Sequence, residues 1–395
     1  MYFKSLLAVA SLASAVLAQD SHLQEYTIQV EGITAKFIPY GARLTSLLVA
    51  DRDGSEQDVA LGYDDPAQYI IDTETNHTYF GPVVGRYANR IRNGTFDLNG
   101  QTYNIPKNEN NGTDTLHGGD VGYDQRNWTV VASNDSSITF SLLDTGFEGF
   151  PGTVLTIVSY AVSVFPSGPQ GEYRPRFTST ITAHALDEPT PIMLSNHIYW
   201  NLNAFKAQTI ENDTTLWMPY ADRWIKTDGI LIPTGEIGTT ASTPGLDFTS
   251  PKTIGEAIAD AEGLCGTNCT GVDNAFINDR PVYVGSDTNL KVLSLWSNTT
   301  GILMELSHNQ QGTQIYTCNG QGGPHPIPIK KSQADRNGNS TGSTEYVQKY
   351  GCIVIEPQAW IDGINHPEWG VDKYEIFSPE TGPLNFYSTY DFSTF

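Results

Sequence analysis

The chain has 395 residues, and its 44 acidic residues outnumber 22 basic ones, which gives a formal net charge of −22. Such a charge repels phosphate backbones and anionic lipid surfaces, so we expect neither nucleic acid nor a membrane as a partner. The length allows one large domain or two, with a sizeable core.

The N-terminus is typical of a secretory signal. Lys4 lies in a short basic region, residues 5–17 are apolar or small, and Val16-Leu17-Ala18 fits a small-residue cleavage site. The apolar run is shorter than the ~20 residues that a membrane-spanning helix needs, and no later segment approaches that length. We therefore expect residues 1–18 to be removed, and residues 19–395 to form a single domain of a secreted, extracellular protein.

Strand signals dominate the rest of the chain. Residues 96–103 contain Asn99-Gly100, a pair that favours the two-residue turn of a hairpin. Residues 138–142 and 176–183 alternate between two faces. The β-branched and aromatic run 153–165 is expected to be buried on both of its faces.

Helix signals are few. Ser250-Pro251 precedes apolar residues at helical spacing, which predicts a short helix with Ser250 as its N-cap. Many short strands with few helices favour a large antiparallel sandwich or barrel. The polar, Gly/Ser/Asn-rich stretch 321–350 lies between two apolar segments, and we interpret it as a surface insertion.

Nine N-glycosylation sequons agree with secretion and predict a glycoprotein. They begin at Asn76, Asn93, Asn111, Asn127, Asn134, Asn212, Asn268, Asn298 and Asn339.

Four cysteines allow three pairings in an oxidising compartment. Cys265 and Cys269 could close a small ring, while Cys318 and Cys352 could tie the base of the insertion; we favour this pairing. A structural zinc site is disfavoured, because the C-x₃-C spacing has no second Cys/His pair at metal spacing.

A histidine inside an apolar run is one candidate for chemistry. His197 has three amides near it in sequence, Asn196, Asn201 and Asn203. A dry core does not tolerate such amides without partners, so a pocket is favoured over a core position.

Glu356 ends a second apolar run and is the candidate base. In a pocket, burial would raise the pKa of this carboxyl, and a donor such as Arg90 would pull it back. Glu356 could then accept a proton while the imidazole of His197 donates one near neutral pH.

Further polar residues could bind a hydroxyl-rich ligand. Asn89 and Arg90 offer an amide and a planar guanidinium, although a surface ion pair explains Arg90 equally well. His117 precedes paired glycines that let backbone approach a ligand. Asp273 and Gln314 could also bind hydroxyls, with a surface turn as the alternative for Asp273.

Two other expectations concern the ligand. Trp200 and Trp360 are the aromatic residues expected nearest the site, because flat rings suit the C–H face of a sugar. The chain contains no phosphate-binding loop, H-E-x-x-H motif, dinucleotide fingerprint or nucleophile elbow, so we expect no cofactor and no metal.

In combination these motifs resemble the aldose 1-epimerase (galactose mutarotase) family across nearly the whole mature sequence. The matching blocks are Tyr79–Ile91 with Leu116–Gly119, Asn196–Leu202, Ile232–Glu236 with Leu246–Phe248 and Asp273, and Gln314–Thr317 with Glu356–Gln358.

The resemblance implies an all-β fold, a large antiparallel β-sandwich of the galactose mutarotase type, and a cofactor-free site for a monosaccharide, a hexose or pentose aldose. It implies Glu356 as general base at the anomeric hydroxyl and His197 as general acid at the ring oxygen. The residues implied to orient the sugar are Asn89, Arg90, His117, Asp273 and Gln314.

A non-catalytic carbohydrate-binding protein on the same scaffold is the alternative, which the presence of both His197 and Glu356 disfavours. A glycoside hydrolase ranks lower, because it needs paired carboxylates around the scissile bond. A hexose-6-phosphate epimerase is disfavoured because no basic cluster lies near the motifs.

Overall fold

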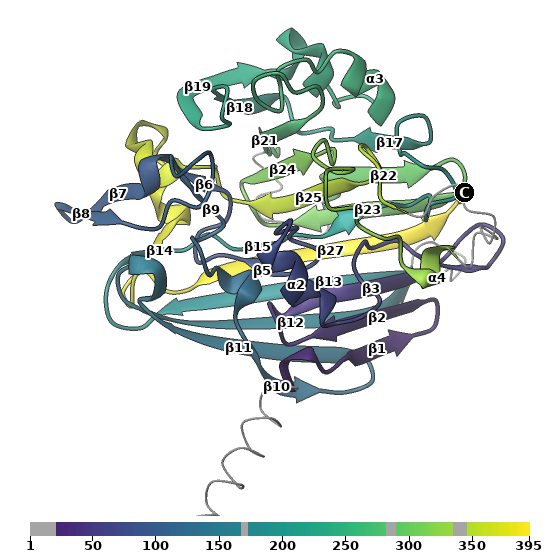
Figure 1. Ribbon diagram of the computed structural model, residues 1–395, viewed down its shortest axis with the longest axis horizontal. Coiled ribbons are helices and arrows are strands. Elements are labelled where there is room, and N and C mark those ends of the chain that lie inside the picture. The colour runs from purple at the N-terminus through teal and green to yellow at the C-terminus, as the bar shows by residue number, and fades with distance from the viewer. Residues whose placement is uncertain (1–20, 167–172, 282–289, 335–345) are drawn as a thin grey trace, which may run out of the picture.

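The computed structural model describes residues 21–166, 173–281, 290–334 and 346–395. The expected signal peptide and the sequon at Asn339 lie outside the described residues. Antiparallel strands are the main regular structure of the described chain, and the helices are short (Figure 1). Within these residues no helix has both the length and the apolar character to cross a membrane.

The largest sheet has nine strands in the order β10-β11-β12-β13-β27-β23-β22-β17-β20. They are β10 (Thr129–Ser133), β11 (Ser137–Thr145), β12 (Thr153–Pro166), β13 (Tyr173–Ala185), β17 (Thr214–Trp217), β20 (Lys252–Thr253), β22 (Leu293–Ser297), β23 (Ile302–His308) and β27 (Leu384–Thr394). The last strand of the chain, β27, lies in the middle of this sheet between β13 and β23 (Figure 1).

Two smaller antiparallel sheets complete the sandwich. The first has the order β16-β25-β24-β21-β18-β19, and the second runs from β1 to β4 in sequence order. Their strands are β16 (Tyr199–Trp200), β18 (Arg223–Thr227), β19 (Pro233–Thr239), β21 (Asp273–Ile277), β24 (Gly312–Tyr316), β25 (Ile353–Gln358), β1 (Tyr26–Val30), β2 (Ile33–Ile38), β3 (Arg43–Ala50) and β4 (Glu56–Asp58). The predicted all-β sandwich is confirmed.

Short strand pairs and helices fill the periphery. The strand pairs are β5 (Val83–Val84) with β15 (Ser195–Asn196), β6 (Arg90–Ile91) with β9 (Thr115–Leu116), β7 (Thr95–Leu98) with β8 (Gln101–Asn104), and β14 (Thr190–Pro191) with β26 (Ile376–Phe377). Within the described residues the α-helices are α2 (Gln68–Glu74), α3 (Ile254–Ala259) and α4 (Lys331–Ala334).

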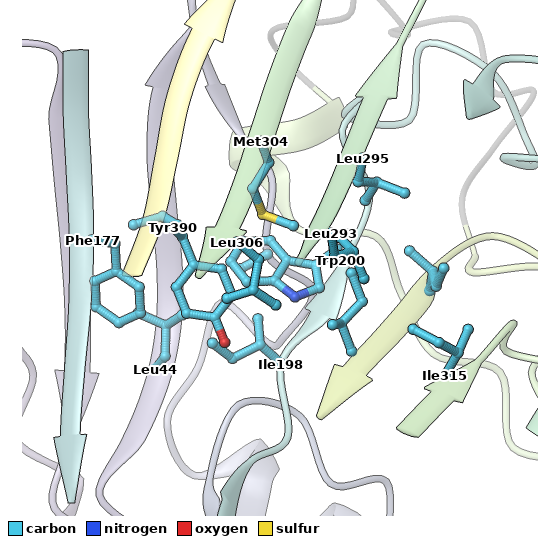
Figure 2. Close-up of a cluster of buried hydrophobic side chains, with 14 of the residues drawn as sticks. Leu44, Phe177, Ile198, Trp200, Leu293, Leu295, Met304, Leu306, Ile315 and Tyr390 are labelled. Carbon is cyan, nitrogen blue, oxygen red and sulfur yellow. The ribbon is translucent and has the colours of Figure 1, made fainter. Parts of the chain in front are cut away.

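Apolar side chains from all three main sheets form one continuous core. Figure 2 shows Trp200 beside Tyr390 and near Met304 and Leu306 in this core. Trp200 is completely buried, and its ring centroid lies 5.1 Å from that of Tyr390. Burial of large rings on this scale supplies much of the driving force for folding.

The hairpin prediction is confirmed. Leu98 pairs with Gln101, and the two turn residues Asn99 and Gly100 have φ angles of 53° and 80°. Asparagine and glycine tolerate these left-handed angles better than other residues do, which is why this pair forms the turn.

Two local predictions need correction. The run 153–165 became β12, but its side chains alternate between buried and half-buried through Val162, so only one of its faces is fully buried. The short helix α3 exists, but its N-cap is Thr253 rather than Ser250. Thr253 and Glu256 form a reciprocal capping box, which satisfies two backbone N–H groups at once.

The cysteines pair as favoured, Cys265 with Cys269 and Cys318 with Cys352. The second disulfide joins the ends of the 321–350 insertion. The described part of that insertion reaches into the body of the protein: the Nζ of Lys330 lies 2.8 Å from a carboxylate oxygen of Asp58, and both side chains are buried.

Candidate active site

One pocket, of about 240 Å³, opens over the six-stranded sheet. Its lining residues are Tyr79, Asn89, Arg90, Glu109, Leu116, His117, His197, Tyr199, Asp273, Gln314, Tyr316 and Glu356. All seven residues predicted for the site are among them. The pocket is smaller than the ~300 Å³ at which pockets for drug-sized ligands begin, so a single small polar molecule is the size of ligand that fits.

The floor of the pocket is a row of polar side chains on three neighbouring strands. Glu356 on β25 pairs with Gln314 on β24, and Asp273 on β21 pairs with Tyr316. Residues that pair across antiparallel strands point to the same face of a sheet. Gln314 donates a hydrogen bond from Nε2 to a carboxylate oxygen of Asp273 at 2.6 Å, which fixes both side chains.

His197 lies between β15 and β16, and its backbone is held on both sides. Its N–H donates to the carbonyl of Pro82 at 2.9 Å, and its carbonyl accepts from the N–H of Gly81 at 2.9 Å. The Nε2 atom of His197 lies 3.4 Å from Oε1 of Glu356. Both side chains are nearly fully buried, with exposed fractions of 6% and 3%.

Asn89 and His117 hold each other in place. Both have left-handed backbone angles, and the N–H of His117 donates to the carbonyl of Asn89 at 3.0 Å. In return the N–H of Asn89 donates to Nδ1 of His117 at 3.1 Å. Nδ1 is therefore an acceptor, so the neutral ring carries its proton on Nε2 and can donate a hydrogen bond.

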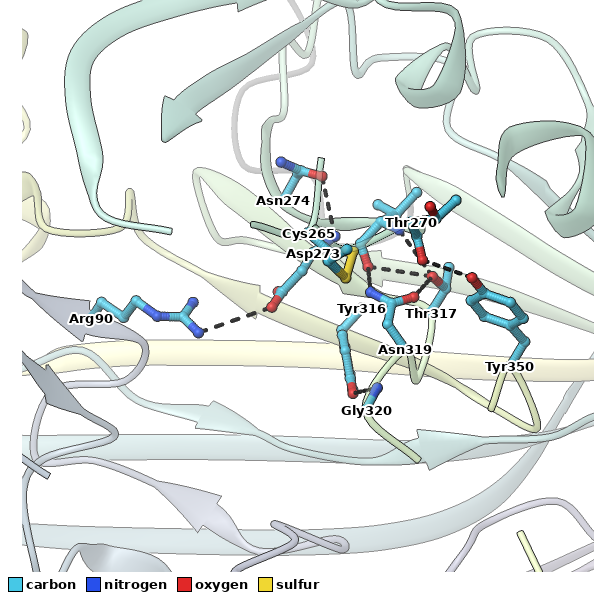
Figure 3. The surroundings of a disulfide bond; sticks show 12 residues. Arg90, Cys265, Thr270, Asp273, Asn274, Tyr316, Thr317, Asn319, Gly320 and Tyr350 are labelled. Atoms are coloured by element: carbon cyan, nitrogen blue, oxygen red, sulfur yellow. Dashed lines mark hydrogen bonds and ion pairs between the residues drawn. A yellow bond between two sulfur atoms is a disulfide. The ribbon is translucent and has the colours of Figure 1, made fainter. Parts of the chain in front are cut away.

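Arg90 is positioned by two carboxylates. Its guanidinium donates two hydrogen bonds to Glu109, at 2.7 and 2.8 Å, and lies 4.0 Å from Asp273 (Figure 3). Arg90 is almost buried, so the bidentate pair fixes its orientation.

A hydrogen-bonded network supports the strand end that presents Asp273. The N–H of Val272 donates to the hydroxyl of Thr317 at 3.0 Å, and the amide of Asn319 donates to the carbonyl of Val272 at 3.0 Å (Figure 3). The hydroxyl of Tyr350 donates to the carbonyl of Thr270 at 2.7 Å. These contacts lie beside the Cys265–Cys269 disulfide.

Burial sets the protonation of the two central groups. Burial, aided by the charge of Asp273 and opposed by that of Arg90, raises the pKa of Glu356 well above its usual value. Burial lowers the pKa of His197 to about 3. Burial, together with the charges of His197 and Arg90, also lowers the pKa of His117 well below its usual value.

The positions of His117, His197 and Glu356 would allow metal binding, but the hydrogen bonds do not. Their ligand atoms lie within 4.8 Å of one another. A neutral histidine that accepts a hydrogen bond on Nδ1 carries a proton on Nε2 and offers a metal no lone pair there. Because the backbone N–H of Asn89 cannot reverse its role, His117 is a donor to a ligand rather than a metal ligand.

The aromatic residues expected near the site are not there. Trp200 faces the core, and Trp360 packs against Trp369 with ring centroids 5.5 Å apart. Tyr199 and Tyr316 line the pocket instead, together with Tyr79.

His197 lines the pocket, as predicted, but the three amides near it in sequence do not. Asn196 donates to the hydroxyl of Tyr160 at 2.9 Å, and Asn201 donates to the carbonyl of Gly351 at 2.8 Å. Asn203 likewise donates to a backbone carbonyl, at 3.1 Å. These amides have structural partners away from the pocket.

Comparisons with known proteins agree with this geometry. The model of the family described as aldose 1-epimerase matches residues 24–376. A probable aldose 1-epimerase of Arthroderma benhamiae is 53% identical over 387 residues, which cover 95% of this chain and 88% of that protein. A galactose mutarotase of Bos taurus is 30% identical over 354 residues, with 88% of each chain covered.

Solved structures show the same fold. A GalM/aldose epimerase homologue from C. elegans superimposes with a TM-score of 0.74 at 26% identity and covers 94% of this chain and 99% of its own. A galactose 1-epimerase from Lactobacillus acidophilus has a TM-score of 0.67 at 21% identity, covering 94% of each chain. The chain therefore belongs to the aldose 1-epimerase family and is an isomerase of that class.

Proposed function

We propose that this epimerase works outside the cell on free aldoses, and that Glu356 and His197 carry the proton transfers. The observation that carries the proposal is the 3.4 Å separation of Nε2 and Oε1 inside a sugar-sized pocket. The anomeric oxygen and the ring oxygen of an aldose are bonded to the same carbon, C1. Two groups that serve these oxygens must therefore be close neighbours, as these two are.

The proposed chemistry requires the pair to hold one proton before a sugar binds. With the pKa of Glu356 raised and that of His197 lowered, this proton favours the carboxyl group over the imidazole. Transfer of that proton from Oε1 to Nε2 gives a carboxylate and an imidazolium without changing the total charge. This second form is the one that can act on a sugar.

In the ring-opening step, Glu356 accepts the proton of the anomeric hydroxyl while His197 donates its proton from Nε2 to the ring oxygen. The bond from C1 to the ring oxygen breaks, and the anomeric oxygen becomes a carbonyl oxygen. After rotation about the C1–C2 bond, the freed hydroxyl attacks the other face of C1. Glu356 then returns its proton to the anomeric oxygen and His197 takes one back, so the enzyme ends as it began.

The remaining polar groups suit the binding of a neutral sugar. Arg90 and the Nε2–H of His117 are donors, whereas Asp273 and Glu109 are acceptors when ionised. Two carboxylates against one guanidinium leave the pocket without spare positive charge for a phosphate group. A free hexose or pentose fits this balance better than a sugar phosphate.

Glu356→Gln tests the chemistry, because glutamine keeps the shape of the side chain but is not a base. Polarimetry of freshly dissolved α-glucose, galactose, xylose and arabinose should show anomer interconversion falling to the buffer rate, while calorimetry still detects sugar binding. Interconversion by the variant at the wild-type rate would overturn the assignment. Sugar binding by the wild-type protein without any interconversion would favour the carbohydrate-binding alternative.

The extracellular location has its own test. Both disulfides are compatible with an oxidising compartment. N-terminal sequencing of protein from the culture fluid of its own cells should begin at Gln19. Recovery of the protein only from the cytosol, with Met1 or the residues after it still present, would contradict this location.

A further inference from the structure

The asparagines of the sequons share one structural property. Eight of the nine sequons fall in the described residues, and in all eight the asparagine is exposed. They are Asn76, Asn93, Asn111, Asn127, Asn134, Asn212, Asn268 and Asn298.

The other asparagines behave differently. The structure describes 22 asparagines, so 14 lie outside sequons, and only three of these 14 are exposed. The three are Asn99, Asn104 and Asn385, whereas the other eleven are buried or half-buried. Exposure therefore follows membership of a sequon and is not a general property of asparagine in this chain.

Surface location of the whole tripeptide does not explain the difference. The hydroxyl residue of each sequon lies two positions after the asparagine, and it is exposed in only two of the eight cases. Thr78, Thr214 and Thr300 are buried, with exposed fractions of 8%, 1% and 1%. The asparagine is the member of the pair that is exposed in every case, and its side-chain nitrogen is the atom to which an N-linked glycan is attached.

The eight sequon asparagines also lie outside the lining of the pocket. None of the eight asparagines is among the twelve residues that line it, so no glycan would be attached to a lining residue. Asn111 comes closest to it in the chain, two positions after Glu109, and Asn76 lies three positions before Tyr79. The amide of Asn76 donates to the carbonyl of His325 at 3.0 Å, at the edge of a small cavity beside residues 320–323. A glycosylated amide keeps one N–H, which is still a hydrogen-bond donor.

We propose that the chain carries N-linked glycans on this exposed set of asparagines. In the transfer, the side-chain nitrogen forms a bond to C1 of a sugar carried by a lipid pyrophosphate. The bond from C1 to the pyrophosphate oxygen breaks, the lipid pyrophosphate leaves, and the amide loses one proton to a base. The inference rests on the extracellular route proposed above and is independent of the epimerase chemistry.

The test uses protein purified from the culture fluid of its own cells. Its intact mass should fall after treatment with a peptide N-glycosidase, which converts each glycosylated asparagine to aspartate. Peptide mapping should place these conversions within the eight sequons and at none of the exposed controls Asn99, Asn104 and Asn385. A secreted protein whose mass does not change would overturn the inference while leaving the extracellular location and the activity intact.

A matched pair of variants sharpens the result. Thr113→Ala destroys the sequon of Asn111, whereas Thr113→Ser preserves it, and Thr113 is exposed, so both variants should fold. The alanine variant should lose the mass of one glycan, and the serine variant should keep it. A mass difference between the two variants of only the one oxygen atom that separates serine from alanine would overturn the assignment at Asn111.

Discussion

Replacement of Glu109 by glutamine tests how Arg90 is held in the pocket. In the wild-type protein the carboxylate of Glu109 accepts two hydrogen bonds from Arg90, at 2.7 and 2.8 Å. Glutamine has almost the same shape but no charge and only one acceptor oxygen, so one of the two bonds is lost. Asp273, 4.0 Å from Arg90, then becomes its main counter-charge, and the guanidinium should turn towards it.

The size of the effect follows from burial. Removal of one partner from a desolvated, hydrogen-bonded charge pair costs about 2–5 kcal/mol. The side chain of Glu109 is 24% exposed and Asp273 remains, so the low end of that range applies. About 2 kcal/mol corresponds to a roughly thirtyfold loss in kcat/KM. Because Arg90 is proposed to bind the sugar rather than to transfer protons, the loss should appear mainly as a higher KM.

Polarimetric progress curves at several concentrations of fresh α-glucose separate kcat from KM. Glu25→Gln is the matched control, because Glu25 forms an ion pair with Lys36 at 2.8 Å in which both side chains are well exposed. Such pairs contribute little, so the control should retain wild-type kinetics. A Glu109→Gln variant with kcat/KM within twofold of wild type would show that the pair does not position Arg90 for the reaction.

Three further outcomes follow from burial and chain connectivity. Because burial lowers the pKa of His197 to about 3, the pH profile of kcat/KM should show no acid limb near 6.5, the usual pKa of an imidazole, and an acid limb there would contradict the assignment. Burial, aided by a hydrogen bond with a neighbouring carboxylate, raises the pKa of Asp114 to about 6, so the folded state binds this proton more tightly than the unfolded chain does. The stability that this bound proton contributes is therefore complete below about pH 4 and decreases by up to about 3 kcal/mol as the pH rises towards 6. Asp114→Asn should reduce the fall in Tm between pH 4.5 and 7.5, and an unchanged fall would refute this. Replacing Cys318 and Cys352 by serine opens a loop with a separation of 34 residues and should lower the free energy of unfolding, measured by chemical denaturation, by about 4 kcal/mol. The other disulfide has a separation of 4 residues, and its removal should cost about 2 kcal/mol, because a shorter loop restricts the unfolded chain less. Equal costs would contradict this argument from loop entropy.

Much of the pocket floor could be predicted from the period of a β-strand. Tyr199 is two positions after His197, and Tyr316 is two positions after Gln314, so alternation places each tyrosine near the polar residue already identified. The same alternation turns Trp200 to the opposite face from Tyr199, into the core. The expectation that placed Trp200 near the ligand used adjacency in sequence, which is the wrong measure in a strand.

Glu109 shows what strand periodicity cannot reveal. It lies between β8 and β9, outside any regular element, and its approach to Arg90 depends on how that connection folds back. No local pattern distinguishes it from the other surface carboxylates of an acidic chain. The partner of a buried arginine has to be found in three dimensions, whereas the arginine itself could be found by its motif.

The role of His117 depends on a single backbone group. Residue types and positions alone make His117, His197 and Glu356 resemble a metal site with an open coordination position. The left-handed backbone at Asn89 turns its N–H towards Nδ1 of His117, and that hydrogen bond decides which ring nitrogen carries the proton. The imidazole becomes a donor suited to a hydroxyl oxygen, and the same three side chains serve acid–base chemistry on a sugar. A sequence specifies the three residues, but the tautomer that separates these two chemistries follows only from the fold.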